Sequence, residues 1–154
     1  MRRTEMKNLF FLPIVILLAS GGCSHDSLEG SIGDRLSLDF DYLQIRKQQL
    51  FLIIEYIKES NRGVEKICKL TVDTQGLELP DGGSLDLEDD VFLSHIELQR
   101  TTFENDSFPQ VKDGYIHFSH IDFRDNGKAE GKFLCIFVDS LTLRGEFTGN
   151  IEEI

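Results

Sequence analysis

The chain has 154 residues, which is enough for one domain of ordinary size, since compact cores usually form from about 100 to 200 residues. It contains 16 Lys and Arg against 27 Asp and Glu, which gives a formal net charge of −11 at pH 7. A chain this acidic repels phosphate backbones, so its composition argues against nucleic acid as a partner.

The first 22 residues differ in composition from the rest of the chain. Arg2, Arg3 and Lys7 precede an apolar run over residues 9–19, and small residues follow that run directly. This order of positive, apolar and small segments is typical of a secretory signal peptide. The apolar run is shorter than the about 20 residues that a membrane-spanning helix needs, so we predict that residues 1–22 are removed on export.

The cleavage region reads Leu-Ala-Ser-Gly-Gly and then Cys23, and it resembles the lipobox of bacterial lipoproteins. In that family the small residues precede a cysteine that becomes the lipidated first residue of the mature chain. The resemblance therefore implies an exported protein that is attached to a membrane by lipid on Cys23. Ser24 implies, by the same resemblance, sorting to the outer membrane or the cell surface. The alternative is an ordinary secreted protein that is cut near Gly22.

Lipid on Cys23 would anchor the chain without using any protein surface, since each buried methylene contributes about 0.8 kcal/mol to membrane binding. The segment 23–34 is rich in Ser, Gly and acidic residues, a composition that is typical of flexible linkers. We therefore divide the chain into a signal peptide over 1–22, a lipidated cysteine and flexible linker over 23–34, and a single β domain over 35–154.

The first half of the predicted domain shows the period-two alternation of half-buried strands. Residues 35–42 alternate, and their apolar members are expected on one inner face: Leu36, Leu38, Phe40 and Tyr42. Residues 50–57 are apolar almost throughout and predict a central strand that is covered on both faces. Near-helical spacing of apolar residues leaves a helix over 42–60 as the alternative. After a turn at 59–63, four residues are expected to share the inner face of a returning strand: Val64, Cys68, Leu70 and Val72.

The second half predicts further strands, over residues 91–99, 115–123, 128–138 and 141–151. The last two form a hairpin that turns at 139–140, and alternate residues of the final strand are expected to face inward: Leu143, Gly145, Phe147, Gly149 and Ile151. In all, about seven to nine short strands separated by turns predict an all-β fold, an antiparallel β-sandwich. A small up-and-down or lipocalin-like barrel is the alternative.

Two cysteines remain when Cys23 is set aside, and they are Cys68 and Cys135. Export would bring them into a compartment in which disulfides persist. A bridge between them would close a long loop and stabilise the fold by roughly 4 kcal/mol on the chain-entropy estimate. The alternative is a pair of buried, unpaired thiols that behave as small apolar side chains.

A short repeat supplies the candidate chemistry of the chain. The segments Ser-His-Ile-Glu-Leu and Ser-His-Ile-Asp-Phe recur in two predicted strands, and each places its histidine and its acid on the outward face. These residues are His95 with Glu97, and His120 with Asp122. If the two strands were antiparallel neighbours in the right register, the four side chains could hold zinc. The alternative is that they are polar residues on the wet faces of half-buried strands.

Known catalytic patterns are missing from the sequence, which has no Gly-x-Ser-x-Gly elbow and no phosphate-cradling glycine loop. We therefore predict a lipid-anchored binding module of the cell envelope, without a cofactor, that recognises a protein, peptide or glycan. A lipocalin-like carrier of a small apolar ligand is the first alternative. A metal-dependent hydrolase that uses zinc on His95 and His120 is the second.

Overall fold

The structure, a computed structural model, describes residues 26–154 and confirms the all-β class. Its helices and strands are, in chain order, β1 (Ser27–Glu29), the 3-10 helix η1 (Ser31–Asp34), β2 (Tyr42–Gln48), β3 (Phe51–Ser60), β4 (Gly63–Asp73), β5 (Asp81–Glu88), α1 (Asp89–His95), β6 (Ile96–Thr101), β7 (Val111–Asp122), β8 (Lys128–Phe137) and β9 (Thr142–Glu153). No helix in this part of the chain is long and apolar enough to cross a membrane.

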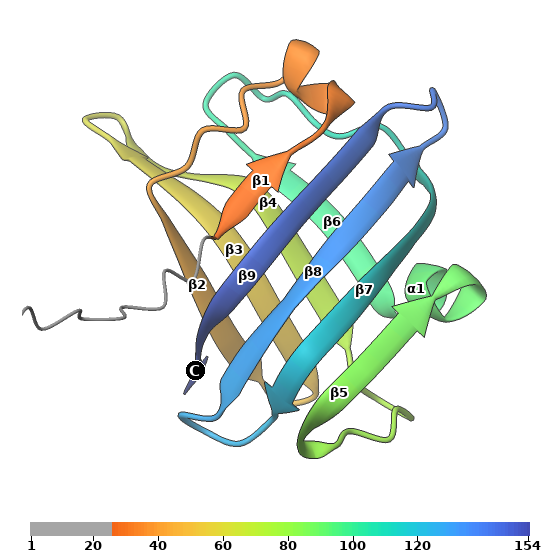
Figure 1. Ribbon diagram of the computed structural model, residues 1–154. Coiled ribbons are helices and arrows are strands. Elements are labelled where there is room, and N and C mark those ends of the chain that lie inside the picture. The colour runs from red at the N-terminus through yellow and green to blue at the C-terminus, as the bar shows by residue number, and fades with distance from the viewer. Residues whose placement is uncertain (1–25) are drawn as a thin grey trace, which may run out of the picture.

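The strands form one curled sheet in the order β5-β7-β8-β9-β2-β3-β4-β6, and β1 pairs with β9 beside this path. Figure 1 shows β1, β5, β7, β8 and β9 in front of β2, β3, β4 and β6, and we call these two groups the front layer and the back layer. The layers are joined because β9 is long enough to pair with β1 and β8 over residues 142–150 and with β2 over residues 151–153.

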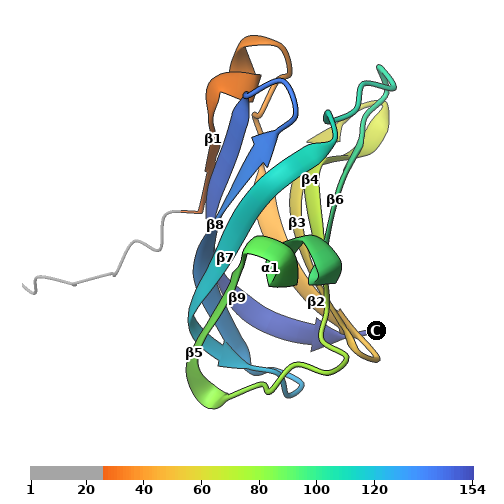
Figure 2. The ribbon, with the colours of Figure 1, turned by 90° about the vertical axis from the view of Figure 1, so that its right-hand side faces the viewer.

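This topology corrects the predicted antiparallel sandwich. The β2–β9 pair is parallel, with Ile45 opposite Ile151, so the sheet is mixed. The sheet also continues from one layer into the other, which makes it a half-barrel with β5 and β6 at its two ends. Figure 2 shows α1 across the open side between these two end strands.

Strand β3 confirms the prediction of a central strand, and the alternative helix over 42–60 is wrong. Residues 52–57 are all buried, and β3 forms a hairpin with β2 in which Ile54 lies opposite Ile45. The residues that point into the core are Leu52, Ile54 and Tyr56, and those that point away from it are Ile53, Glu55 and Ile57.

In the returning strand β4, three of the four expected residues face the core, whereas Val64 is 56% exposed. The pairing with β3 changes register between Tyr56 and Ile57, and Ile67 occupies the extra place. A β-bulge of this kind shifts the alternation by one residue. The side chains before the bulge therefore face the other way, and Val64 is turned to solvent.

The segment 35–41 is not a strand, which corrects that prediction. It passes over one end of the core, where Ile57 O accepts a hydrogen bond from Asp41 N and Ser37 O accepts one from Arg100. Leu36, Leu38 and Phe40 still pack against the core, while Tyr42 is exposed at the start of β2. Alternation therefore reported correctly which side chains are covered, but it could not show whether the backbone pairs with a neighbour.

The structure also corrects the linker that we expected up to Asp34. Residues 27–29 pair with β9 as strand β1, and the backbone N–H of Thr148 donates to Asp26. Leu28 and Ile32 are buried in the core. These two apolar side chains are enough to fix a segment whose composition is otherwise that of a linker. Residues 1–25, including Cys23, lie outside the described residues.

The expected strand over 91–99 is instead the helix α1 followed by β6. Asp89 and Asp90 lie in the first turn of α1, where negative side chains interact favourably with the helix dipole and stabilise the helix. Phe92 is buried among core residues, while Val91 and Leu93 are each 44% exposed. The helix thus uses one aromatic side chain to cover the open side of the half-barrel.

Large aromatic side chains fill the space between the two layers. Six of them are completely buried: Tyr56, Phe92, Phe118, Phe133, Phe137 and Phe147. The Tyr56 ring lies edge to face against Phe40 and Phe133, and Phe118 does the same with Phe147. Such pairs add about 0.5 to 1.5 kcal/mol each beyond the area that they bury.

Candidate functional site

The four residues of the predicted zinc site do not come together. β6 pairs only with β4, and β7 pairs with β5 and β8, so the two repeated segments are not neighbours. His95 and Glu97 line a hollow beside α1 and β4, while His120 and Asp122 lie on β7 in the front layer. Residues 26–154 contain no group of three or more His, Cys, Asp or Glu side chains that could hold a metal ion.

The two histidine-acid segments have structural partners instead. His95 Nδ1 lies 2.7 Å from the carbonyl oxygen of Asp73, which connects the end of α1 to β4. Arg124 donates two hydrogen bonds to Asp122, and these hold the pKa of that carboxyl below its usual value. The repeat in the sequence therefore marks two unrelated places in the fold, one at the junction of α1 and β6 and one on β7.

Cys68 and Cys135 are both buried and are free thiols in the structure. Burial raises the pKa of Cys135 to about 12 and that of Cys68 well above its ordinary value. A thiol in such a setting stays protonated and is a poor nucleophile. In the structure the two cysteines are therefore buried, unpaired thiols and not a disulfide. Neither is a candidate for catalysis.

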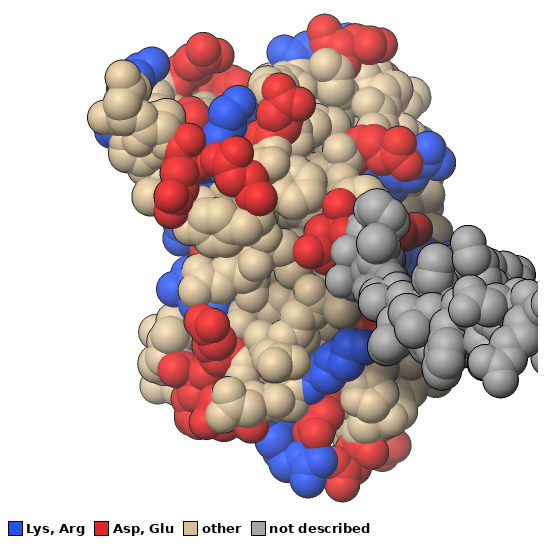
Figure 3. Space-filling view, turned by 60° about the vertical axis from the view of Figure 1, so that its left-hand side comes forward, with Lys and Arg blue, Asp and Glu red and all other residues tan. Residues whose placement is uncertain are grey.

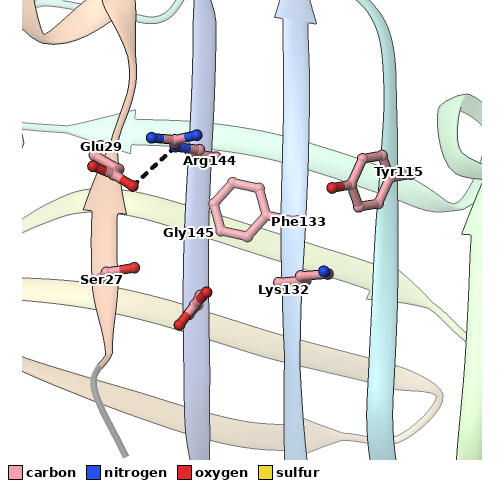
Figure 4. Close-up of a pocket in the computed structure, with 8 residues that line it drawn as sticks. Ser27, Glu29, Tyr115, Lys132, Phe133, Arg144 and Gly145 are labelled. Carbon is pink, nitrogen blue, oxygen red and sulfur yellow. Dashed lines mark ion pairs between the residues drawn. The ribbon is translucent and has the colours of Figure 1, made fainter.

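A shallow hollow of about 300 Å³ lies on the outer face of the front layer. Six polar or aromatic side chains from β1, β7, β8 and β9 surround it: Ser27, Glu29, Tyr115, Lys132, Arg144 and Glu146. Figure 4 shows Lys132 between Ser27 and Tyr115, with the Tyr115 hydroxyl pointing toward β8. The hollow beside α1 and β4, by contrast, has acidic side chains in its lining but no Lys or Arg.

Strand register builds this hollow from two parallel rows of outward side chains. The first row crosses the front layer in the order Ser27, Glu146, Lys132, His117 and Asp86. The second row crosses it in the order Glu29, Arg144, Leu134, Tyr115 and Glu88. Side chains directly opposite one another on paired strands lie about 4.5 to 5.5 Å apart at their Cβ atoms, so each row is continuous.

The charged groups of the hollow are only partly neutralised by each other. Arg144 and Glu29 form an ion pair at 2.9 Å, but both side chains are more than half exposed, so the pair is weak. Lys132 and Glu146 are opposite in the register, yet neither forms an ion pair with any residue in 26–154. An ammonium group and a carboxylate are thus available to a ligand in the centre of the hollow.

The floor of the hollow is supported from the core side by Gly145. A Cβ atom at this position would come within 2.5 Å of the Phe133 ring and 2.8 Å of the Tyr56 hydroxyl. The Tyr56 hydroxyl donates a hydrogen bond of 2.8 Å to the carbonyl oxygen of Glu146. The missing side chain lets two buried aromatic residues reach β9, and this contact holds the strand that carries Arg144 and Glu146.

Tyr115 also borders a second, smaller hollow of about 110 Å³. Its acidic lining comes from Glu88, Asp89 and Asp113, with Leu134 and Ile136 beside them. Tyr115 is 37% exposed and stands between the two hollows. A ligand that packs on this ring could therefore extend into either of them.

Sequence reasoning placed Arg144 and Glu146 on the outer face of the last strand, and both are exposed. It did not single out Tyr115 or Lys132. A large aromatic residue at an outward position of an amphipathic strand was the available signal, because outward positions usually carry polar side chains.

Comparison with known proteins gives no further guidance: no protein-family model matches the chain, and no curated protein or solved structure is significantly similar to it.

Proposed function

We propose that the chain is an exported, lipid-anchored binding module of the cell envelope, and that the hollow around Tyr115 and Lys132 is its ligand site. The observation that carries this proposal is the pair of complete side-chain rows across the front layer, with an exposed ring beside an ammonium group that has no ion-pair partner among residues 26–154. Exposed aromatic rings and unpaired charges gathered in one hollow are characteristic of binding sites.

The anchor part of the proposal depends on residues 1–23, whose charge, apolar run and cysteine match a lipoprotein signal. Strand β1 begins at Ser27, so a lipid on Cys23 would lie at most about 14 Å from that residue along an extended chain. Ser27 lines the hollow. A lipidated chain would therefore hold this site close to the membrane surface.

The two alternatives have less support. The completely buried rings of the core occupy the space in which a lipocalin-like carrier would hold its ligand. The zinc hydrolase loses its basis with the separation of His95 and His120.

The anchor is tested by expressing the full chain in a bacterial host with radiolabelled palmitate. We expect label on the wild-type protein and none on Cys23→Ser, because the thiol is the acylated atom. Membrane fractionation should show the wild type in the envelope. An unlabelled wild-type protein that is intact in the cytosol would contradict the proposed location.

The site is tested by screening the full chain, in detergent, against peptide and glycan arrays. Any ligand that binds should lose affinity on Tyr115→Ala, since that change removes the ring shared by both hollows. Tyr42→Ala is the matched control, because Tyr42 is 41% exposed at the start of β2 in the back layer. Equal loss of binding in the two variants would show that the hollow is not the site.

A further inference from the structure

We infer that the ligand of the hollow is an uncharged saccharide. This inference rests on the proposed function, and it adds the chemical class of the ligand to it. Three features of the hollow support it: its position in the sheet, the balance of its charges and the orientation of its aromatic ring.

The hollow lies in the middle of the front layer, where the backbone is already paired. At this place β7 pairs with β5 and β8, β8 pairs with β7 and β9, and β9 pairs with β8 and β1. An extended peptide binds a sheet by adding a strand to a free edge. At the rim, β1 keeps one free edge but is only three residues long. Over β7, β8 and β9 the backbone is paired on both sides, so a ligand there is recognised by side chains.

The charges around the hollow cancel. Lys132 and Arg144 supply two positive charges, and Glu29 and Glu146 supply two negative ones. An anionic ligand would face both carboxylates and the acidic lining of the neighbouring hollow, while a cationic ligand would face Lys132 and Arg144. Neither sign of ligand charge is therefore favoured.

A polyhydroxylated ligand uses both kinds of charged group at once. A hydroxyl group can donate a hydrogen bond to a carboxylate and accept one from an ammonium or guanidinium group. Hydrogen bonds to charged partners are roughly twice as strong as those between neutral groups. Neighbouring hydroxyls of a sugar ring match the carboxylate of Glu146 and the ammonium of Lys132, which lie opposite one another on β9 and β8, with Arg144 in the adjacent row.

Tyr115 supplies the apolar contact that such a ligand also needs. Its ring combines an apolar body with a polar tip, and the hydroxyl points toward β8 (Figure 4). One face of a sugar ring presents C–H groups, which can pack on an aromatic face. Because Tyr115 borders both hollows, the site suits an oligosaccharide of more than one unit.

The experiment compares three matched oligosaccharide series with the full chain by isothermal titration calorimetry. The series are uncharged oligomers (N-acetylglucosamine, cellulose-type and xylan-type), cationic glucosamine oligomers and anionic galacturonate oligomers. We expect at least one uncharged oligomer to bind. Its affinity should change little between low and high salt, because screening acts on charged ligands.

Variants locate the binding. Tyr115→Ala should weaken it about tenfold, which corresponds to about 1.4 kcal/mol, while Tyr115→Phe should retain most of the affinity. Lys132→Gln and Glu146→Gln should each weaken it, and Tyr42→Ala should leave it unchanged. Thermal unfolding of each variant checks that the fold is intact.

The saccharide inference is overturned if no uncharged oligomer binds, or if only a charged series binds with strong salt dependence. It is also overturned if an uncharged oligomer binds equally well to Tyr115→Ala. If peptides from the array bind and their binding depends on Tyr115, the saccharide inference is wrong but the proposed binding function stands. Saccharide binding that ignores Tyr115, Lys132 and Glu146 would remove the proposed site itself.

Discussion

The outer faces of the two layers both carry acids and bases in the middle of paired strands, but they use them differently. In the back layer Glu55 is 0% exposed and lies between Arg46 of β2 and Lys66 of β4. In the front layer Glu146 and Lys132 are exposed and form no ion pair with the described residues. The contrast teaches that charged groups without ion-pair partners point to a candidate binding site, whereas a high density of charged groups does not.

Burial explains why the back-layer triad is structural. Ile53 and Ile57 are buried on either side of Glu55 on the same face of β3, so water cannot solvate its carboxylate. Burial alone would raise the pKa of Glu55, but the ion pair with Lys66, at 2.5 Å, and the charge-assisted hydrogen bond from Arg46 outweigh it and lower the pKa. The carboxylate stays charged because both cations hold it.

Charge is spread over the surface with acids in excess. Figure 3 shows one side of the molecule on which acidic side chains are more prominent than basic ones. The balanced hollow therefore stands apart from the acidic character of the whole chain, whose net charge is −11. The general excess of acidic side chains favours solubility. The local balance is what the proposed recognition of an uncharged ligand requires.

The largest expected effect comes from breaking the back-layer triad. Glu55→Gln should lower the free energy of unfolding by about 3 kcal/mol, since it leaves two cations without their shared partner. The value lies at the low end of the range for buried pairs, because Arg46 and Lys66 are partly exposed. Urea unfolding measures it. The same change in the front layer, Glu146→Gln, should alter stability by less than about 0.5 kcal/mol.

The pH dependence of stability sharpens this first test. A carboxyl whose pKa is lowered in the folded state stabilises the fold above its unfolded pKa, and that contribution is lost as the pH falls through the folded pKa. For Glu55 the loss should begin below its usual pKa of 4.5. The stability gap between wild type and Glu55→Gln should therefore narrow in urea titrations below this pH. A gap that stays constant would mean that the triad does not act through charge.

The next effect concerns the floor of the front-layer hollow. Gly145→Ala should destabilise the fold by about 2 kcal/mol, because the new methyl group would overlap the Phe133 ring and the Tyr56 hydroxyl. Calorimetric melting would measure it. Gly33→Ala is the control, since its Cβ would make an ordinary contact with Leu38. Similar melting temperatures for the two variants would rule out the proposed close packing beneath the hollow.

The smallest effect tests the hydrogen bond between the core and β9. Burial holds the pKa of Tyr56 well above its ordinary value, so its hydroxyl stays protonated and can donate to Glu146 O. Tyr56→Phe should cost about 1 kcal/mol in urea unfolding. Tyr42→Phe loses an exposed hydrogen bond to Glu59 and should change little. Equal stabilities of the two variants would argue that the buried bond contributes nothing.

Several elements could be predicted because their signals are local. The β8–β9 hairpin turns at Ser140, which has a φ of 67°, and Leu143, Phe147 and Ile151 face inward as their period-two spacing indicates. Strand β3 was recognisable from its unbroken apolar run. Turn chemistry and alternation act over a few residues, so a sequence displays them directly.

Other elements depend on partners that are distant in the sequence. β1 and η1 are held in place because Leu28 and Ile32 are buried in the core beside β9. In the same way, α1 forms where Phe92 covers the open side. The parallel β2–β9 pair, the bulge at Ile67 and the candidate hollow also arise this way.

The sequence by itself determined the all-β class, the central strand, the last hairpin and which side chains of the final strand face outward. Only the tertiary structure decided that Glu29, Arg144 and Tyr115 share one row, while His95 and His120 lie apart. The reason is physical. Alternation along a strand is set by local geometry, whereas register between strands far apart in the chain is set by the packing of the whole core.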